Sequence, residues 1–224
     1  MANRHEEKYI IDYHQYTLLR SRAMDALTPD PHTTDGSYVI TSLYYDDPLD
    51  TALDEKLDGL SVHSKFRIRT YDFSDKLINL ERKDKFGIQT RKYSAPISKE
   101  QIEMLNGTAT DIGYFHGNAR YLATEICTKQ LLPSVAVRYT RDAFVFAGTD
   151  LRLTFDTQLE AIGPTADALF SWKTCGIPVL DGNSVIMEIK YGKYLPSFVR
   201  KMTDIDCSQL SVSKYALCRE RLFI

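Results

Sequence analysis

The chain of 224 residues is poor in several features that would mark a special class of protein. It has one Trp, 11 Gly and 8 Pro, and its net charge is only −2, from 28 Lys+Arg and 30 Asp+Glu. The low Gly and Pro content excludes collagen-like and low-complexity chains. The 43% hydrophobic content with so small a net charge excludes a disordered chain. A protein that coats DNA with an all-over basic surface is excluded because Lys and Arg are not in surplus.

Long apolar runs are also missing. Residues 143–147 (AFVFA) fall far short of the ~18–20 apolar residues that cross a bilayer. The first eight residues are charged where a secretory signal is apolar, so we expect no export signal. Cys127, Cys175, Cys207 and Cys218 form no CxxC pair and have no His at metal-ligand spacing. Two disulfides are arithmetically possible, but reduced thiols in a cytoplasmic protein are favoured.

The sequence is rich in 14 Tyr and 10 Phe and in period-two alternation, which is typical of β-strands. The patterns predict strands at 4–11, 38–46, 64–72, 77–85, 87–95, 134–147, 151–159, 178–180 and 184–191. They predict helices at 13–27 (capped by Asp12), 48–57, 99–105 (capped by Ser98), 119–131 (capped by Asn118), 196–202 and 213–223. Without a repeat or a linker, residues 1–224 are expected to form a single α+β domain. About eight antiparallel strands are enough to close a barrel surrounded by helices.

The alternation separates cations from apolar side chains. In the strand at 64–72, Lys65, Arg67 and Arg69 alternate with Phe66 and Ile68. Other polar positions of this kind are Glu81, Lys83, Lys85, Lys92, Tyr139, Arg141, Arg152, Thr154, Asp156, Glu188 and Lys190. One such strand usually turns its cations to solvent. Taken together, the strands carry few acids to pair these cations, and a closed sheet with this face inside would need a polyanion in its lumen. The pattern therefore indicates a phosphate site.

Eight segments carry a family resemblance and run in the family's order along the chain. They are 4–9 (RHEEKY), 42–46 (SLYYD), 65–69 (KFRIR), 80–83 (LERK), 138–144 (RYTRDAF), 151–156 (LRLTFD), 188–191 (EIKY) and 211–215 (SVSKY). On these residues the chain resembles the VTC (vacuolar transporter chaperone) domain, the polyphosphate polymerase branch of the triphosphate tunnel metalloenzymes, which also include CYTH-type phosphatases. The resemblance implies an eight-stranded antiparallel tunnel that binds a triphosphate or polyphosphate chain.

The resemblance also implies roles for individual residues in a transfer of the ATP γ-phosphate to a growing polyphosphate chain. The implied catalytic residues are Arg67, Arg69, Lys83, Arg141, Arg152 and Lys190. The implied phosphate-binding residues are Lys8, Lys85, Lys92, Tyr139, Ser213 and Lys214. Glu188 is the implied ligand of Mn²⁺ or Mg²⁺, with Glu81 or Glu6 as further candidates. The expected partners are ATP and polyphosphate or pyrophosphate, with no nucleic acid. A separate membrane protein is a further candidate, because the sequence shows no membrane segment of its own.

Two departures from the family pattern bear on the activity. CYTH-type phosphatases begin with Glu-x-Glu-x-Lys, whereas this chain has Arg4-x-Glu6-x-Lys8. A cation thus replaces one metal carboxylate, which favours a polymerase over a two-metal hydrolase. Lys85 stands where some polymerases of the family carry a different phosphate-binding side chain. The alternatives are an inorganic tri- or polyphosphate hydrolase and a non-catalytic module that binds polyphosphate or nucleotide.

Structural roles compete with chemical ones at several of these positions. Glu188 could be the ion-pair partner of Lys190 or Lys214, and Glu81 that of Arg67 or Arg69. Asp156 is expected to be an ion-pair partner. The Tyr44-Tyr45 pair is expected to pack in the protein rather than stack on a base.

Overall fold

The computed structural model describes residues 5–33, 36–87, 89–107, 111–207 and 209–222, and these form two compact units. Unit 1 comprises Met1–Tyr38, Tyr139–Leu159 and Leu180–Val212, and unit 2 comprises Val39–Arg138, Glu160–Val179 and Ser213–Ile224. Three strands, β3 (Ser37–Asp46), β7 (Leu132–Val145) and β8 (Arg152–Ile162), contain the boundaries between the units. Each unit has a hydrophobic core of its own.

The remaining strands are β1 (His5–Asp12), β2 (Thr28–Pro29), β4 (Val62–Tyr71), β5 (Ser74–Phe86), β6 (Gln89–Pro96), β9 (Ile177–Pro178) and β10 (Ser184–Tyr191). The strand pairs β1–β10, β10–β8, β2–β7, β3–β4, β4–β5, β5–β6 and β8–β9 are antiparallel. Eight strands follow the order β1-β10-β8-β7-β3-β4-β5-β6, while β2 pairs with β7 and β9 with β8. The expected α+β class with a large antiparallel sheet is confirmed, whereas the predicted eight-stranded barrel is not closed by pairing among the described strands.

The hydrogen-bonded order is an open path, because β1 and β6 end it without pairing with each other among the described strands. In unit 1 another segment contacts β1. Tyr9 bridges to Gln209, and the Leu210 backbone N–H donates to the Lys8 carbonyl at 2.8 Å. The segment before the C-terminal helix thus satisfies backbone groups of β1 that a further strand would otherwise pair.

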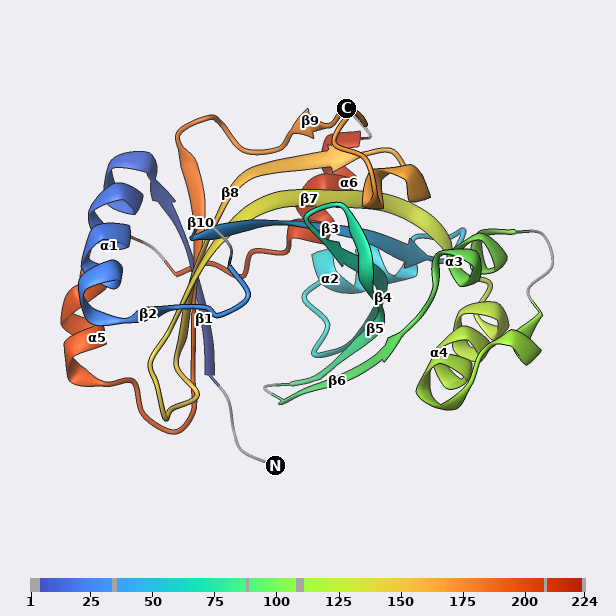
Figure 1. Ribbon diagram of the computed structural model, residues 1–224, viewed down its shortest axis with the longest axis horizontal. Coiled ribbons are helices and arrows are strands. Elements are labelled where there is room, and N and C mark those ends of the chain that lie inside the picture. The colour runs from blue at the N-terminus through green and yellow to red at the C-terminus, as the bar shows by residue number, and fades with distance from the viewer. Residues whose placement is uncertain (1–4, 34–35, 88, 108–110, 208, 223–224) are drawn as a thin grey trace. The chain divides into compact units, whose positions relative to one another are not determined.

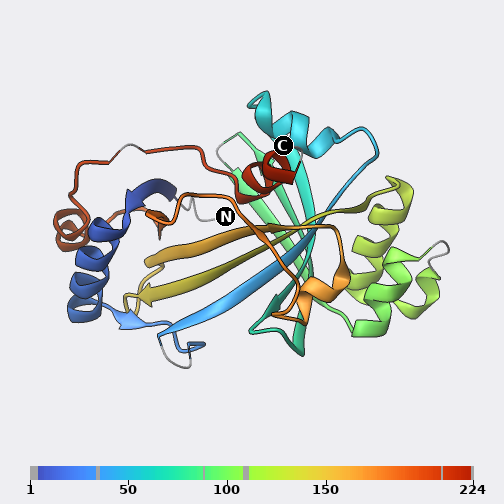
Figure 2. The ribbon, with the colours of Figure 1, turned by 90° about the horizontal axis from the view of Figure 1, so that it is seen from above.

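Unit 1 buries the apolar face of its strands against two helices, α1 (Tyr13–Ala26) and α5 (Ser197–Met202), which lie side by side in both views (Figures 1 and 2). Asp12 caps α1 as predicted: its carboxylate accepts from the Gln15 backbone N–H at 2.7 Å, and the Gln15 side chain accepts from the Asp12 N–H. Leu19 and Ala23 then face the core formed by Met187, Leu153 and their neighbours.

Unit 2 packs α3 (Lys99–Asn106) and α4 (Gly117–Thr128) against the apolar face of β4, β5 and β6, on the right of Figure 1. Phe66, Ile68 and Leu80 are buried there against Leu122 of α4. The unit also contains α2 (Thr51–Leu57), α6 (Lys214–Leu222) and the 3-10 turns η1 (Ile112–Tyr114) and η2 (Ala166–Leu169). The predicted Ser98 cap of α3 is present, with Gln101 completing it.

Several predicted boundaries differ from the structure, and those of two helices differ for reasons that the structure shows. The helix placed at 119–131 begins at Gly117 after His116, so Asn118 lies in the first turn and caps nothing. It ends at Thr128 because Gln130 takes a left-handed φ of 53°, which turns the chain into β7. The helix expected from Pro48 begins at Thr51, and β2 forms at Thr28–Pro29, where no strand was predicted. Ile88 and Phe223, included in predicted elements, lie outside the described residues.

We predict that Leu122→Ala lowers the free energy of unfolding by about 2–5 kcal/mol, because it leaves a cavity in the core of unit 2. Arg120→Ala, on the exposed side of the same helix, should change it by less than about 0.5 kcal/mol. Urea unfolding followed by circular dichroism measures both. Equal losses for the two variants would contradict the assigned faces of α4.

Candidate functional site

The strands of unit 2 present the predicted polar face. Phe66 and Ile68 of β4 are buried in the core, so Lys65, Arg67 and Arg69 project from the opposite face. The neighbouring strands contribute Ser42 and Tyr44 from β3, Glu81, Lys83 and Lys85 from β5, and Lys92 from β6. Lys83 is the register partner of both Lys65 and Lys92. The face therefore gathers six cations from three adjacent strands.

Glu81 is the anion among these cations. It is only 2% exposed, and its Oε2 accepts from Arg67 Nε at 2.7 Å and from Arg67 Nη2 at 2.6 Å. Its Oε1 lies 2.6 Å from Lys92 Nζ. Burial raises the pKa of Glu81, but Arg67, Arg69 and Lys92 outweigh that effect and lower the pKa to about 2. Both carboxylate oxygens are engaged by cations, so the structure gives Glu81 the ion-pair role that competed with a metal role.

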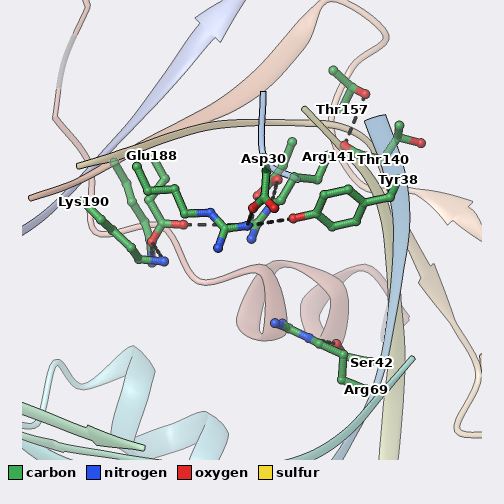
Figure 3. A network of polar contacts seen from close by, with 12 residues as sticks. Asp30, Tyr38, Ser42, Arg69, Thr140, Arg141, Thr157, Glu188 and Lys190 are labelled. Carbon is green, nitrogen blue, oxygen red and sulfur yellow. Dashed lines mark hydrogen bonds and ion pairs between the residues drawn. The ribbon is translucent and has the colours of Figure 1, made fainter. Parts of the chain in front are cut away.

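Hydrogen bonds to β3 orient the two arginines of β4. Arg67 Nη1 donates to the Tyr44 hydroxyl at 2.9 Å, and Arg69 Nε donates to Ser42 Oγ at 3.1 Å (Figure 3). Burial raises the pKa of Tyr44, but the charges of Arg67 and Arg69 lower it by a larger amount. The pKa of Tyr44 therefore falls below its ordinary value. Tyr44 thus packs inside the protein, as expected, and also holds Arg67 in place.

Side-chain contacts hold the start of α6 against this face. Lys65 Nζ donates to Ser213 Oγ at 3.2 Å and lies 5.1 Å from the centre of the Tyr215 ring. The Tyr215 hydroxyl donates to Asp46 Oδ2 at 2.5 Å, at the end of β3. One turn later Arg219 binds Asp50 and the Ser134 carbonyl. Ser213 and Lys214, expected to bind phosphate, therefore lie at a fixed helix start beside Lys65.

The polar face of unit 1 is built by three strands in register. Lys8 of β1, Glu188 of β10 and Thr154 of β8 form one cross-strand row, and Glu6, Lys190 and Arg152 form the next. The alternate residues Tyr9, Met187 and Leu153 belong to the core of the unit. The face therefore carries both acids and cations in two adjacent rows.

Glu188 is the centre of the first row and is 4% exposed. Its Oε1 lies 3.0 Å from Lys190 Nζ and 3.9 Å from Lys8 Nζ, and its Oε2 lies 3.9 Å from Arg141 Nη2 (Figure 3). Lys8 also contacts Glu6 at 2.8 Å. Burial lowers the pKa of Lys190 to about 8, and Glu188 only partly opposes this. Lys190 would regain its full charge beside an added anion.

Arg141 and Arg152 are each bound to a buried acid. Arg141 donates from Nε and Nη2 to the two oxygens of Asp156 at 2.6 and 2.8 Å, and lies 5.2 Å from the Tyr139 ring centre. Burial lowers the pKa of Arg141, but Asp156 outweighs this and raises the pKa above its ordinary value. Asp156 thus has the expected ion-pair role.

The partners of Arg152 were not predicted from the sequence. Arg152 Nη2 lies 2.6 Å from Asp30 Oδ2 and donates to the Tyr38 hydroxyl at 2.8 Å (Figure 3). No role was predicted for Asp30 from the sequence, and it is 122 positions from Arg152. With Glu6, Asp30, Asp156 and Glu188, unit 1 pairs its cations with acids. The expectation that acids would be scarce on the polar faces is wrong for this unit and holds for unit 2.

Unit 1 has the chemistry to hold a divalent ion through few protein ligands. Mn²⁺ and Mg²⁺ prefer oxygen ligands, which phosphates and water can complete. Glu188 and Glu6 share one face, and the hydroxyl of Thr154, across from Glu188, is buried without a hydrogen-bond partner among the described residues. No group of three or more His, Cys, Asp and Glu side chains forms a ligand cluster in the described part of the chain. Glu188 is the residue that would hold the ion, with phosphate oxygens supplying the other ligands.

The chain is similar to known proteins over nearly its whole length. A family model described as the VTC domain matches residues 3–223. No curated protein matches it by sequence. The "putative adenylate cyclase" of Bacillus halodurans has a similar structure, with a TM-score of 0.55, 12% identity, and coverage of 94% of this chain and 95% of the other.

Two further solved structures share the fold. A protein from Pyrococcus horikoshii OT3 has a TM-score of 0.54 and 11% identity, with coverage of 97% of this chain and 99% of the other. The "putative adenylate cyclase" of Vibrio parahaemolyticus has a TM-score of 0.53 and 11% identity, with coverage of 96% and 97%. At these identities the likeness shows the fold alone.

The chain belongs to the VTC-domain family, as its eight segments predicted, and it shares its fold with these three solved structures. None of the described helices is both long and apolar enough to cross a membrane. All four cysteines are free thiols, as expected.

We predict that Glu81 contributes acid-sensitive stability. Its pKa in the folded chain, about 2, lies below its ordinary 4.5, so the contribution is present above pH 4.5 and is lost as the pH falls toward 2. Glu81→Gln should cost about 2–3 kcal/mol of unfolding free energy at pH 7 and much less at pH 3. Urea unfolding at both pH values measures this.

The matched control is Asp75→Asn, which changes an exposed carboxylate on the same strand. It should alter stability little at either pH. A Glu81→Gln penalty that stays constant from pH 7 to pH 3 would show that the carboxylate does not hold these cations.

Proposed function

We propose that the protein is a metal-dependent polyphosphate polymerase-like enzyme that uses ATP. The observation that carries the proposal is the charge of the unit 2 polar face. Lys65, Arg67, Arg69, Lys83, Lys85 and Lys92 share it with the buried carboxylate of Glu81. Like charges this dense are costly unless an anion neutralises them, and a phosphate chain has the required charge and oxygen acceptors. Residues 1–224 would act as a single domain, with the phosphate chain in the tunnel that the family implies.

Positioning and charge neutralisation supply most of the catalysis in phosphoryl transfer. Arg67 and Arg69 would grip phosphate oxygens with their planar forks, while Lys83, Lys85, Lys92 and Lys214 would add point charges. Arg141, Arg152, Lys190, Lys8 and Tyr139 would do the same on unit 1, with Ser213 at the start of α6. A divalent ion held by Glu188 would neutralise charge on the phosphate oxygens.

The proposed reaction needs no protein nucleophile. An oxygen of the terminal phosphate of the chain attacks the γ-phosphorus of ATP, the bond from that phosphorus to the β–γ bridging oxygen breaks, and ADP leaves with that oxygen. The sequence at 4–8 favours this polymerase over a hydrolase; Arg4 lies outside the described residues, whereas Glu6 and Lys8 are paired in β1. A cytoplasmic location and a separate membrane partner remain predictions.

We predict that the purified chain, incubated with ATP and Mn²⁺ or Mg²⁺, forms ADP and a polymer that is visible on a gel. Arg69→Ala should reduce the rate about 100-fold or more, because it removes a charged donor to phosphate. Arg69 suits the test because its described hydrogen bond is to Ser42, and it is not one of the direct partners of Glu81. Lys201→Ala, which removes an exposed cation of α5, should leave the rate unchanged.

Other products would identify the alternatives. Phosphate release from tripolyphosphate without nucleotide would favour the hydrolase. Polyphosphate binding without ATP turnover, unaffected by Glu188→Ala, would favour the binding module. If the wild type makes neither polymer nor ADP, the polymerase proposal fails.

Binding of tripolyphosphate should weaken steeply with salt, because several phosphate charges are neutralised at once. Calorimetric titrations at about 50 mM and 500 mM NaCl should give dissociation constants that differ at least tenfold. A flat response to salt would contradict a cation-lined phosphate site.

A further inference from the structure

Two hydrogen-bond donors of β8 lie buried without partners on the polar face of unit 1. The hydroxyl of Thr154 and the Nε of Arg152 make no hydrogen bond within the described part of the chain. Thr154 is 2% exposed, so solvent does not readily satisfy it. The two residues are two positions apart in a strand and therefore share a face. Buried polar groups are nearly always satisfied, so this pair calls for an acceptor from outside the chain.

The surroundings of Thr154 indicate the chemistry of that acceptor. Its register partner is Glu188, and the next row on the same face holds Arg152 and Lys190. Glu188 already contacts Lys190 and Arg141. The same face also carries Asp156, and both carboxylates are already paired with cations, Asp156 with Arg141 and Glu188 with Lys190. The hydroxyl is therefore suited to donate to an anionic oxygen of a ligand that these cations also attract.

A second threonine, Thr41, also has a buried hydroxyl without a hydrogen-bond partner among the described residues, but it lies away from the polar faces. Thr41 of β3 in unit 2 is 1% exposed and also lacks a hydrogen-bond partner among the described residues. It alternates with Ser42 of the polar face, so it lies on the side of the core residues Leu43 and Tyr45. Its register partner on β4 is the uncharged Thr70. Thr41 is therefore a matched comparison for Thr154.

We propose that Thr154 contacts the substrate and donates its hydroxyl hydrogen bond to a phosphate oxygen of the bound chain. This inference rests on the proposed function, because it assigns a phosphate contact to the polar face of unit 1. In the absence of phosphate the unpaired hydroxyl lowers the free energy of unfolding. A hydrogen bond to bound phosphate would remove this destabilisation. The variant Thr154→Val, which keeps the branched shape, should therefore affect stability and binding in opposite directions.

The test uses the purified chain with tripolyphosphate in EDTA, by thermal unfolding and calorimetric titration. Thr154→Val should unfold at the same temperature as the wild type or higher, and should bind about tenfold or more weakly. Thr154→Ser, which restores the hydroxyl, should recover the affinity. Thr41→Val should bind like the wild type.

Each other outcome has a defined meaning. If Thr154→Val binds within twofold of the wild type, the inference is wrong. It is also wrong if the loss appears only when Mn²⁺ is added, because the hydroxyl would then act on the metal ion. If the wild type itself does not bind tripolyphosphate, the proposed function fails instead.

Discussion

A buried carboxylate on each polar face determines how that face is built. Glu81 in unit 2 and Glu188 in unit 1 are almost fully buried, and each contacts cations from its own or neighbouring strands. Without such an anion, Arg67 and Lys92 would be neighbouring like charges in a partly desolvated environment, which is unfavourable. With it, the guanidinium of Arg67 is fixed before any ligand arrives. This preorganisation is what electrostatic catalysis requires.

The two faces differ in charge balance, and the difference suggests different tasks. Unit 2 sets one carboxylate against six cations, so it retains a strong attraction for anions. Unit 1 pairs Arg141 with Asp156 and Arg152 with Asp30, which leaves its arginines nearly neutralised. In the proposed function, a face of the first kind would attract phosphate mainly by charge. One of the second kind offers carboxylate oxygen, which a divalent ion needs.

Local patterns predicted the parts of the structure that depend on near neighbours. The caps at Asp12 and Ser98 and the face assignment of Lys65–Arg69 follow from spacings of two to four residues. The end of α4 could not be predicted, since it depends on the left-handed Gln130. Nor could the Asp30–Arg152 ion pair, because no local periodicity reports a contact between residues 122 positions apart. The sequence located the cations and the candidate counter-ions Glu81, Asp156 and Glu188, whereas the counter-ion Asp30 became visible only in the structure.

The same reasoning explains why two distant sequence segments carry the family signature together. The first, at 42–46, ends in Asp46, whose oxygens accept from backbone N–H groups at the start of α2 and from the Tyr215 hydroxyl. The second, at 211–215, ends in that tyrosine. Ser213, two residues before Tyr215, accepts a hydrogen bond from Lys65. By holding Tyr215, Asp46 thus helps to position Ser213, a phosphate-binding candidate. A carboxylate with all its acceptors in use is a rigid anchor. For that reason a residue outside the polar face can belong to the signature of the site.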